Sequence, residues 1–245
     1  MEHLLPILFV FISFIYSSVG LGGGSAYTAL MAILGVSYMV IPITSLTLNL
    51  VVTFFGMINF WRKGYGRLNL IGPFLVTSIP MAYLAGSLVI PETIFKIILI
   101  STLLLVVVRI FIINELTFSF KLSSGQKWIM IIALGSVLGF IAGTVGIGGG
   151  IYLVPLIIMS GLGSAKEAAA TGAMFIWINS LVGFIARFQR ETFDSDFILP
   201  LIGAVIIGGG TGSYFGSVFY DAKTIQKVMG TILIVAIIFL IQGLI

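Results

Sequence analysis

The sequence has no cysteine and a single histidine, His3. Without cysteine, the chain cannot form a disulfide, bind a metal through thiolates or use a thiol nucleophile. One histidine near the N-terminus leaves almost nothing from which to build a metal centre or a histidine-based catalytic site. These absences predict a protein that is not an enzyme and that needs no metal and no cofactor.

Charged residues are also scarce. Only 8% of the 245 residues are charged and 59% are hydrophobic, whereas ordinary soluble domains have roughly 25% charged residues. The longest polar interval, residues 114–127, still contains apolar residues and is too short for a soluble domain. We therefore expect an all-α, multi-pass protein of the inner cell membrane, surrounded by the lipid bilayer. Basic cytoplasmic loops explain the net charge of +4, which therefore predicts no nucleic-acid partner.

Carboxylates are missing from the interior of the predicted spans. Beyond the N-terminus, the acidic residues lie at segment ends or in loops: Glu92, Glu115, Glu167, Glu191, Asp194, Asp196 and Asp221. Chains of intramembrane carboxylates commonly relay protons in transporters. The sequence therefore predicts no carboxylate relay across the core.

Glycine, in contrast, is abundant, and one short glycine stretch occurs twice. Residues 20–24 read GLGGG and residues 146–150 read GIGGG, and each stretch lies between apolar runs. Glycine weakens a helix interior by roughly 1 kcal/mol per residue, so three adjacent glycines should interrupt a helix. A broken helix at membrane depth is tolerated only where it is buried in protein or lines a cavity. We expect the two breaks to form the functional site.

Five apolar segments follow one another in the same order in each half of the chain. They lie near residues 4–19, 25–36, 42–60, 70–89 and 93–113 in the first half, and near 128–145, 151–160, 167–188, 197–218 and 223–243 in the second. Outside the glycine stretches, three pairs of identical residues are each 127 positions apart, a difference that we call the repeat offset. The pairs are Thr44 with Thr171, Gly56 with Gly183, and Pro73 with Pro200. The pattern predicts two membrane repeats, residues 1–113 and 128–245, joined by a linker at 114–127. Such duplication is typical of secondary transporters, whose sites lie near the midplane between the repeats.

The relative orientation of the repeats depends on the short second segment. At about 12 residues, segment 25–36 is too short to span a bilayer that requires roughly 20. If it forms a re-entrant pair with segment 4–19, each half crosses three times and the repeats are inverted. If segment 4–19 crosses alone, the repeats are parallel. Placing the basic loop 61–67 inside the cell slightly favours the inverted arrangement, which is our prediction.

A helix that begins at the midplane should bind an anion. Its first N–H groups are unpaired and it presents the positive end of the helix dipole, equivalent to about half an elementary charge. Segments 25–36 and 151–160 begin directly after the glycine stretches, and consecutive glycines can turn successive N–H groups inward as a nest. The predicted backbone cradle consists of Gly22, Gly23, Gly24, Gly148, Gly149 and Gly150. Close helix packing or a plain hinge is the alternative explanation for these glycines.

The two breaks differ in the residues that follow them. Ser25 could donate from its hydroxyl and cap the helix after the first break, whereas Ile151 occupies the matching position in the second half. Pro155 has no N–H to donate, so we expect it to delay the start of the second short helix. The predicted site is therefore asymmetric.

The third segment of each half carries most of the intramembrane polar side chains. The candidate substrate-binding residues there are Thr44, Ser45, Asn49, Thr171 and Asn179, with Thr53 and Ser180 in the same polar set. Ser45 and Asn49 are separated by about one helical turn, so they should share one helix face. The alternative for the hydroxyls is a hydrogen bond to the carbonyl one turn back.

Two further features have interpretations that place them outside the site. Glycines one helical turn apart, Gly135, Gly139 and Gly143 in one segment and Gly208, Gly212 and Gly216 in another, are predicted to let helices pack closely. Arg187 is the most deeply placed cation. We expect its side chain to snorkel to the membrane surface.

The motifs GLGGGS, VGIGGGIYLVP, PITSL and AATGA, the loops WRKGYGRLN and FQRETFDSD, and the prolines near the start of segments 70–89 and 197–218 carry a family resemblance. In these features the sequence resembles the sulfite exporter TauE/SafE (TSUP) family of membrane permeases over nearly its whole length. The resemblance implies eight spans and transport of small anions such as sulfite, sulfonates, sulfoacetate or carboxylates. It assigns functional roles to the two glycine motifs, Thr44 and Thr171. Ser45 follows the first threonine, but Gly172 follows the second.

Together these features predict a secondary membrane transporter of a small anion, which is held at the midplane by the two glycine breaks. A coupling proton or other ion is a further expected partner, and the pattern predicts no particular oligomeric state. A passive anion channel is the alternative, favoured by the lack of core carboxylates. An intramembrane enzyme or sensor subunit is a third possibility, but the sequence offers no nucleophile–base pair to support it.

Overall fold

The computed structural model describes residues 4–112, 124–188 and 193–218, together with 231, 233, 234 and 236–241. These residues form helices and no strand. The helices are α1 (Leu4–Ser17), α2 (Gly24–Ile33), α3 (Val40–Arg62), α4 (Leu68–Ser87), α5 (Glu92–Phe111), α6 (Ser124–Val145), α7 (Gly150–Met159), α8 (Ala165–Phe188) and α9 (Ser195–Val218). They confirm the predicted apolar segments up to residue 218. The predicted segment 223–243 and most of the linker lie largely outside the described residues.

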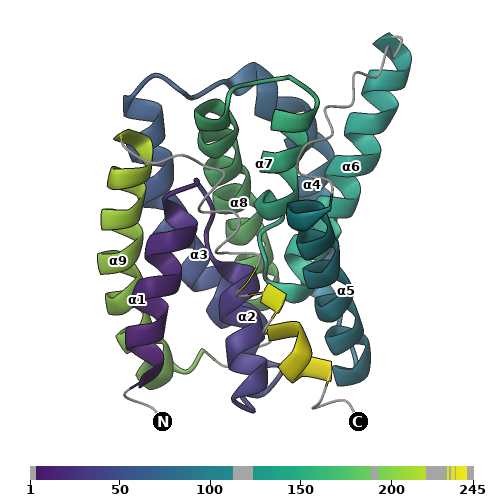
Figure 1. Cartoon of the computed structure of the whole chain (residues 1–245). Helices are drawn as coiled ribbons and strands as arrows, with labels where there is room; N and C mark the ends of the chain where they lie inside the picture. Colours follow the sequence, from purple (N-terminus) through teal and green to yellow (C-terminus); the bar gives the residue numbers. More distant parts are fainter. Residues whose placement is uncertain are drawn as a thin grey trace.

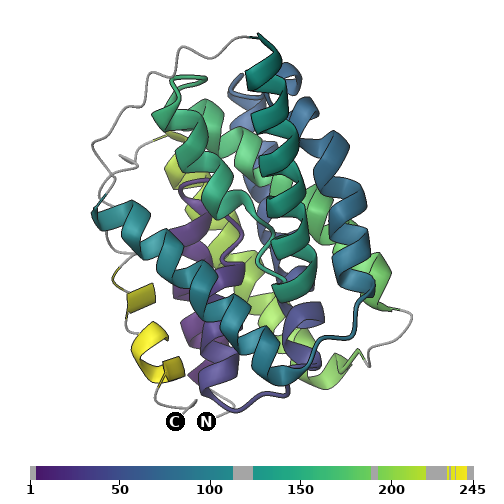
Figure 2. The ribbon, with the colours of Figure 1, turned by 90° about the vertical axis from the view of Figure 1, so that its right-hand side faces the viewer.

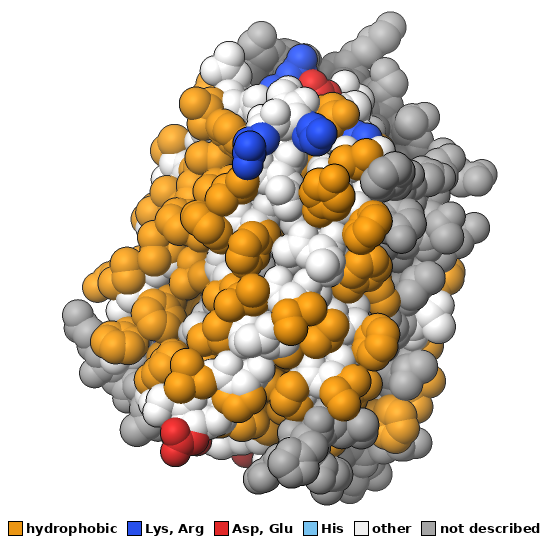
Figure 3. Space-filling model, turned by 90° about the vertical axis from the view of Figure 1, so that its left-hand side faces the viewer, with side chains coloured by type: hydrophobic (Ala, Val, Ile, Leu, Met, Phe, Trp, Pro, Cys, Tyr) orange, Lys and Arg blue, Asp and Glu red, His pale blue; other side chains and the backbone are white. Residues whose placement is uncertain are grey.

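Within the described ranges, five helices are long and apolar enough to cross a membrane: α3, α4, α8, α9 and residues Trp128–Val145 of α6. Helices α1 and α2 are shorter, with 14 and 10 residues. Hydrophobic side chains cover the face seen in Figure 3, with lysine and arginine side chains gathered at one end of it. The chain is therefore built as a multi-pass helical membrane protein.

We call the end of the bundle that carries Arg62, Lys63, Arg67 and Lys166 the basic end, and the other the opposite end. Helix α3 ends at the basic end, where a short loop leads into α4, which runs back (Figures 1 and 2). Helix α8 begins at the basic end and ends at the opposite end. Helix α1 rises towards the basic end in Figure 1, whereas α6 descends from it.

The glycine ridges of α6 and α9 lie in helix–helix contacts, which confirms their predicted packing role. A Cβ atom added to any of these glycines would overlap the backbone of the neighbouring helix. On α9, Gly208 lies against Val10, Gly212 against Phe14 and Gly216 against Ser18; on α6, Gly135 lies against Phe74, Gly139 against Ser78 and Gly143 against Ala82. Residue numbers rise together in both contacts, so α9 runs parallel to α1 and α6 runs parallel to α4.

Helices α3 and α8 form the centre of the bundle and run antiparallel, because Gly56 lies beside Ala173 whereas Gly183 lies beside Leu46. Helix α9 packs on α3, and α4 packs on α8. Helix α3 of the first half is thus covered by α9 of the second half, and α8 of the second half is covered by α4 of the first. Each central helix also lies near the broken helix pair of its own half. This arrangement buries both glycine breaks inside the bundle.

Helix α7 begins at Gly150, so the predicted delay at Pro155 is wrong. Pro155 lies inside the helix at its sixth residue. The missing proline N–H removes one helical hydrogen bond. Burial of Leu153, Val154 and Ile157 in the hydrophobic core keeps this short helix in place.

Candidate functional site

Both glycine breaks end in a left-handed glycine that serves as the N-cap of a short helix. Gly23 has φ 88° before α2, and Gly149 has φ 72° before α7. A side chain would be strained in this conformation. Glycine has no side-chain oxygen, so neither N-cap can accept a side-chain hydrogen bond from the first-turn N–H groups. The N-cap carbonyls of Gly23 and Gly149 do accept from the N–H groups of Ala26 and Tyr152, at 3.0 and 3.2 Å. Residues 20–24 and 146–150 are all buried.

Ser25 does not cap α2, contrary to our prediction. Because α2 begins one residue earlier, at Gly24, Ser25 lies within the first turn rather than at the N-cap. Its Oγ lies 3.2 Å from the hydroxyl of Tyr16 and donates to it. Ser25 therefore ties the first break to α1, and its side chain contributes to the site only through that contact.

The two breaks meet at the centre of the bundle, and two α3 side chains join them. The Ser45 hydroxyl lies 2.9 Å from the carbonyl oxygen of Gly146 and 3.3 Å from that of Gly24. Asn49 Nδ2 donates to the same Gly146 carbonyl at 3.0 Å. Thr28, on α2, donates to Ser45 at 3.1 Å. Ser45 and Asn49 share one helix face, as predicted, and that face contacts both breaks.

The glycines are required by close approach as well as by backbone conformation. A Cβ on Gly22 or Gly24 would meet the amide group of Asn49, and a Cβ on Gly148 or Gly150 would meet the side chain of Ile176. The repeat offset makes Asn49 and Ile176 matching positions of the two halves. Each break is therefore packed against the same position of its own third helix.

Each break also contacts the third helix of the other half. A Cβ on Gly146 would lie 2.8 Å from the carbonyl oxygen of Pro42, and one on Gly20 would overlap the carbonyl of Ala169. Pro42 and Ala169 are again matched by the repeat offset. The repeats are thus interlocked at the breaks.

The remaining candidates in α3 and α8 divide into two groups. Thr171 donates to the carbonyl of Glu167 at 2.8 Å, and Asn179 Nδ2 donates to that of Phe175 at 2.9 Å, so both bond within α8. Among the described residues, four oxygens of these helices are buried without a hydrogen-bond partner: Thr44 Oγ1, Asn49 Oδ1, Asn179 Oδ1 and Ser180 Oγ. Such groups cost about 1–3 kcal/mol each when unpaired, so they mark places where a ligand would gain hydrogen bonds.

Ser180 is part of this site although we did not include it among the predicted binding residues. Its Oγ would lie 3.3 Å from a Cβ on Gly148. The repeat offset matches it to Thr53, whose methyl group would lie 3.1 Å from a Cβ on Gly22. Extending the repeat offset to every polar residue of the third segments would have found it.

Aromatic side chains close the basic end above the breaks. Phe60 is buried with Ala169 and Ala170, and Trp61 and Tyr65 pack against them. Trp61 Nε1 donates to the carbonyl of Ala170 at 3.3 Å. A surface cavity of about 650 Å³ at this end is walled by Trp61 and Arg67, and its lining includes no residue of either break.

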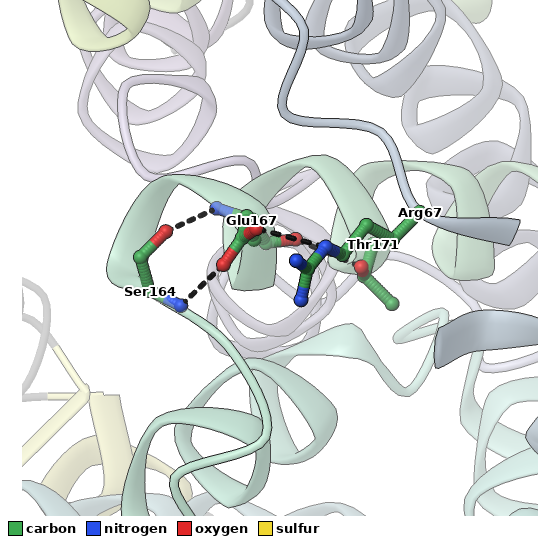
Figure 4. A network of polar contacts seen from close by, with 4 residues as sticks. All are labelled: Arg67, Ser164, Glu167 and Thr171. Carbon is green, nitrogen blue, oxygen red and sulfur yellow. Dashed lines mark hydrogen bonds and ion pairs between the residues drawn. The ribbon is translucent and has the colours of Figure 1, made fainter. Parts of the chain in front are cut away.

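An ion pair crosses from the basic loop to the start of α8 (Figure 4). Arg67 Nε lies 2.9 Å from Glu167 Oε1. Glu167 also accepts from the Ser164 N–H at 2.7 Å, while its own N–H donates to the Ser164 hydroxyl at 3.3 Å. This reciprocal capping box fixes the first turn of α8. The ion pair links that turn to the loop between α3 and α4.

Arg187 does not snorkel to the surface, contrary to our expectation. Its side chain is buried, with a residue exposure of 4%. Nη2 donates to the carbonyl oxygens of Gly143 and Thr144, at 2.8 Å in each case, and Nε to Gly143 at 3.2 Å. The last carbonyls of α6 lack helical donors and attract a cation through the helix dipole, which explains why the guanidinium turns inward.

Arg187 lines a cavity of about 180 Å³ at the opposite end. The other lining residues are Tyr38, Met39, Pro42, Leu88, Val89, Ile90, Phe95 and Thr144. Within the described part of the chain, no three His, Asp or Glu side chains are grouped as metal ligands would be. The polar chemistry of this region therefore consists of backbone N–H groups, hydroxyls, amides and one guanidinium.

Comparison with known proteins is consistent with this architecture. The family model "Sulfite exporter TauE/SafE" matches residues 5–240. The chain is 31% identical over 244 residues to the probable membrane transporter protein y4hK of Sinorhizobium fredii, covering 95% of each chain. It is 24% identical over 245 residues to the probable membrane transporter protein YjnA of Bacillus subtilis, covering 93% of this chain and 94% of that protein. No solved structure matches.

Proposed function

The chain belongs to the sulfite exporter TauE/SafE family of membrane transporters, and we propose that it is a secondary transporter of a small anion. The anion would be sulfite, a sulfonate, sulfoacetate or a small carboxylate. It would bind where the two glycine breaks meet. The observation that carries the proposal is that α2 and α7 both begin inside the protein with a glycine N-cap, so their first-turn N–H groups have no side-chain acceptor.

The binding group in this proposal is the backbone. The N-terminal ends of α2 and α7 each carry a positive partial charge of about half an elementary charge. Two such ends at one buried place favour a single negative charge, and the glycines let the anion approach the N–H groups closely. The hydroxyls of Thr44 and Ser180, which lack partners, can donate to the same ligand. Gly22, Gly23, Gly24, Gly148, Gly149, Gly150, Ser45 and Asn49 complete the proposed site.

The helix directions support an inverted repeat. Helix α1 runs parallel to α9 and α3, whereas α6, its counterpart, runs parallel to α4 and α8. The packing partners are also exchanged: α9 covers α1 and α3, and α4 covers α6 and α8. An inverted repeat with its site at the repeat interface allows the site to open alternately to each side, which a transporter requires. A coupling proton or other ion would bind with the substrate.

The transport proposal can be tested by filling the breaks. Gly23→Leu and Gly149→Leu should each abolish anion flux in proteoliposomes, because both positions need a left-handed backbone and a side chain there would distort the break. A Cβ on Gly23 would meet the Tyr27 ring, and one on Gly149 would meet Leu138 and Phe175. Gly203→Leu on α9 is the matched control, since no heavy atom lies within 4 Å of a Cβ there. Normal flux in both break variants, with a normal control, would remove the site assignment.

Ligand binding can be tested without flux. We expect one or more of sulfite, thiosulfate, taurine, sulfoacetate and small carboxylates to raise the Tm of the purified protein, because a ligand that binds only the folded state stabilises it. If none of them raises the Tm, the anion assignment is wrong.

A passive anion channel is the second candidate function, since the described spans hold no buried carboxylate for proton coupling. A transporter should show flux that saturates with anion concentration and that responds to an imposed ion gradient. Flux that rises linearly with concentration and ignores every gradient would identify the channel instead.

A further inference from the structure

The cavity lined by Arg187 lies beside the second glycine break. Two of its lining residues, Pro42 and Thr144, lie at that break. Thr144 is two residues before Gly146, and the Pro42 carbonyl would lie 2.8 Å from a Cβ on Gly146. At its outer edge the cavity is lined by Met39 and Val89, which are 54% and 80% exposed. The cavity therefore extends from the surface of the opposite end to residues that lie beside the break.

The cavity contains a side chain that can recognise an anion. Arg187 is the charged residue among the nine that line it, and its guanidinium is held by the carbonyls of Gly143 and Thr144. An arginine stays charged at every physiological pH and presents a planar set of donors that matches an oxyanion. Most of the remaining lining is apolar: Met39, Pro42, Leu88, Val89, Ile90 and Phe95.

The matching position at the basic end has a different character. The repeat offset pairs Arg187 with Phe60, which is buried among alanines and aromatic side chains. The matching positions thus carry a cation at the opposite end and a buried apolar side chain at the basic end. The carbonyls at the end of α6 account for the burial of Arg187, and its guanidinium also lines the cavity.

We propose that this cavity captures the anion from the opposite end, with Arg187 recognising its negative charge, before the anion moves to the glycine breaks. The ligand class is a singly charged oxyanion with a small apolar part, such as an alkyl sulfonate or a short carboxylate. A volume of about 180 Å³ corresponds to about six water molecules at about 30 Å³ each, which suits a ligand of this size. The proposal rests on the proposed transport function.

The test uses the absence of cysteine from the chain. Met39→Cys gives a single thiol at the mouth of the cavity, which an uncharged, membrane-impermeant maleimide should label from one side of a proteoliposome. Methanesulfonate should slow this labelling at least about threefold, whereas the neutral dimethyl sulfone should not. Only a charged ligand gains the electrostatic attraction of the Arg187 guanidinium. Equal protection by the two compounds would overturn the capture site.

Charge reversal at an exposed neighbour supplies the matched pair of variants. In the Met39→Cys background, Val89→Asp should raise the half-protecting methanesulfonate concentration about three- to tenfold, and Val89→Lys should lower it by a similar factor. Arg187→Gln should remove protection and Arg187→Lys should retain part of it. The Val89 variants leave the hydrogen bonds of Arg187 intact, so identical protection in both of them would refute the proposal even if the Arg187 variants fold poorly.

The same vesicles separate this inference from the transport function. Anion flux without methanesulfonate protection would reject the capture site and keep the transporter. Protection by methanesulfonate without flux of any tested anion would keep the binding site and reject transport.

Discussion

The two halves of the protein build their glycine breaks on the same backbone plan but surround them with different side chains. At matching positions the first half has Ser45 and Asn49, where the second has Gly172 and Ile176. Ser45 and Asn49 both reach the Gly146 carbonyl. Gly172 has no side chain and so offers no hydroxyl to the Gly20 carbonyl, although a Cβ at this position would lie only 3.6 Å from that oxygen.

This difference teaches that the first half supplies the side chains that donate to the carbonyls of both breaks. The second half contributes backbone, apolar packing, the Ser180 hydroxyl beside Gly148 and, at its far end, Arg187. The two breaks thus share their backbone conformation and differ in the side chains around them. If the polar side matters for transport, matched substitutions in the two halves should have unequal effects.

The largest difference is expected at the first helical residue after each break. Gly24→Ala places a Cβ 2.9 Å from the Gly146 carbonyl and 2.5 Å from Asn49 Nδ2, whereas Gly150→Ala mainly meets the side chain of Ile176. Backbone and hydrogen-bonded groups cannot move away as an isoleucine can, so Gly24→Ala should cost about 1–3 kcal/mol of stability and lower flux at least about tenfold. Tm and proteoliposome flux measure both effects. Equal losses in the two variants would contradict the asymmetry.

Asn49→Leu should have the next largest effect. It removes the Nδ2 hydrogen bond to Gly146 at nearly constant volume, which should cost about 1–2 kcal/mol and lower flux several-fold. Ile176→Leu is the control at the matching position, and an apolar swap of equal volume should cost less than about 1.5 kcal/mol. Equal flux in the two variants would show that the amide has no role in transport.

Ser45→Ala should have a smaller effect, because Asn49 still donates to the Gly146 carbonyl. We expect a loss of about 0.5–1.5 kcal/mol and a modest fall in flux. Gly172→Ser tests the converse, since its new hydroxyl would lie near the Gly20 carbonyl once the Val154 side chain rotates away. Thermal unfolding measures the stability of both variants. If Ser45→Ala has a higher Tm than the unchanged protein, the hydrogen bonds of the Ser45 hydroxyl do not stabilise the fold.

The smallest effect is expected from the ion pair between Arg67 and Glu167. More than half of the Arg67 side chain is exposed, and exposed ion pairs contribute little because solvent screens them. Arg67→Gln should change flux less than about twofold, and the difference should vanish at about 1 M salt, where the Debye length is about 3 Å. A large effect that persists at high salt would make this contact a gate at the basic end.

The sequence determined the positions of the helices and of the two breaks. Apolar length and the low helix propensity of adjacent glycines are local properties, so residues 20–24 and 146–150 interrupt the helices where expected. Polar residues inside an apolar segment led to Ser45 and Asn49, and one-turn spacing led to the glycine ridges. Three expectations were wrong: the N-cap of α2 is Gly23 rather than Ser25, Pro155 lies inside α7, and Arg187 is buried instead of reaching the membrane surface.

Only the tertiary structure decided which of these residues meet. The bond from Ser45 to Gly146 joins residues 101 apart, and it exists because the second break packs against α3. Arg187 is buried because the end of α6 offers it unpaired carbonyls, which no pattern within α8 could reveal. Local sequence therefore sets where the backbone breaks, whereas long-range packing sets which side chains face the breaks.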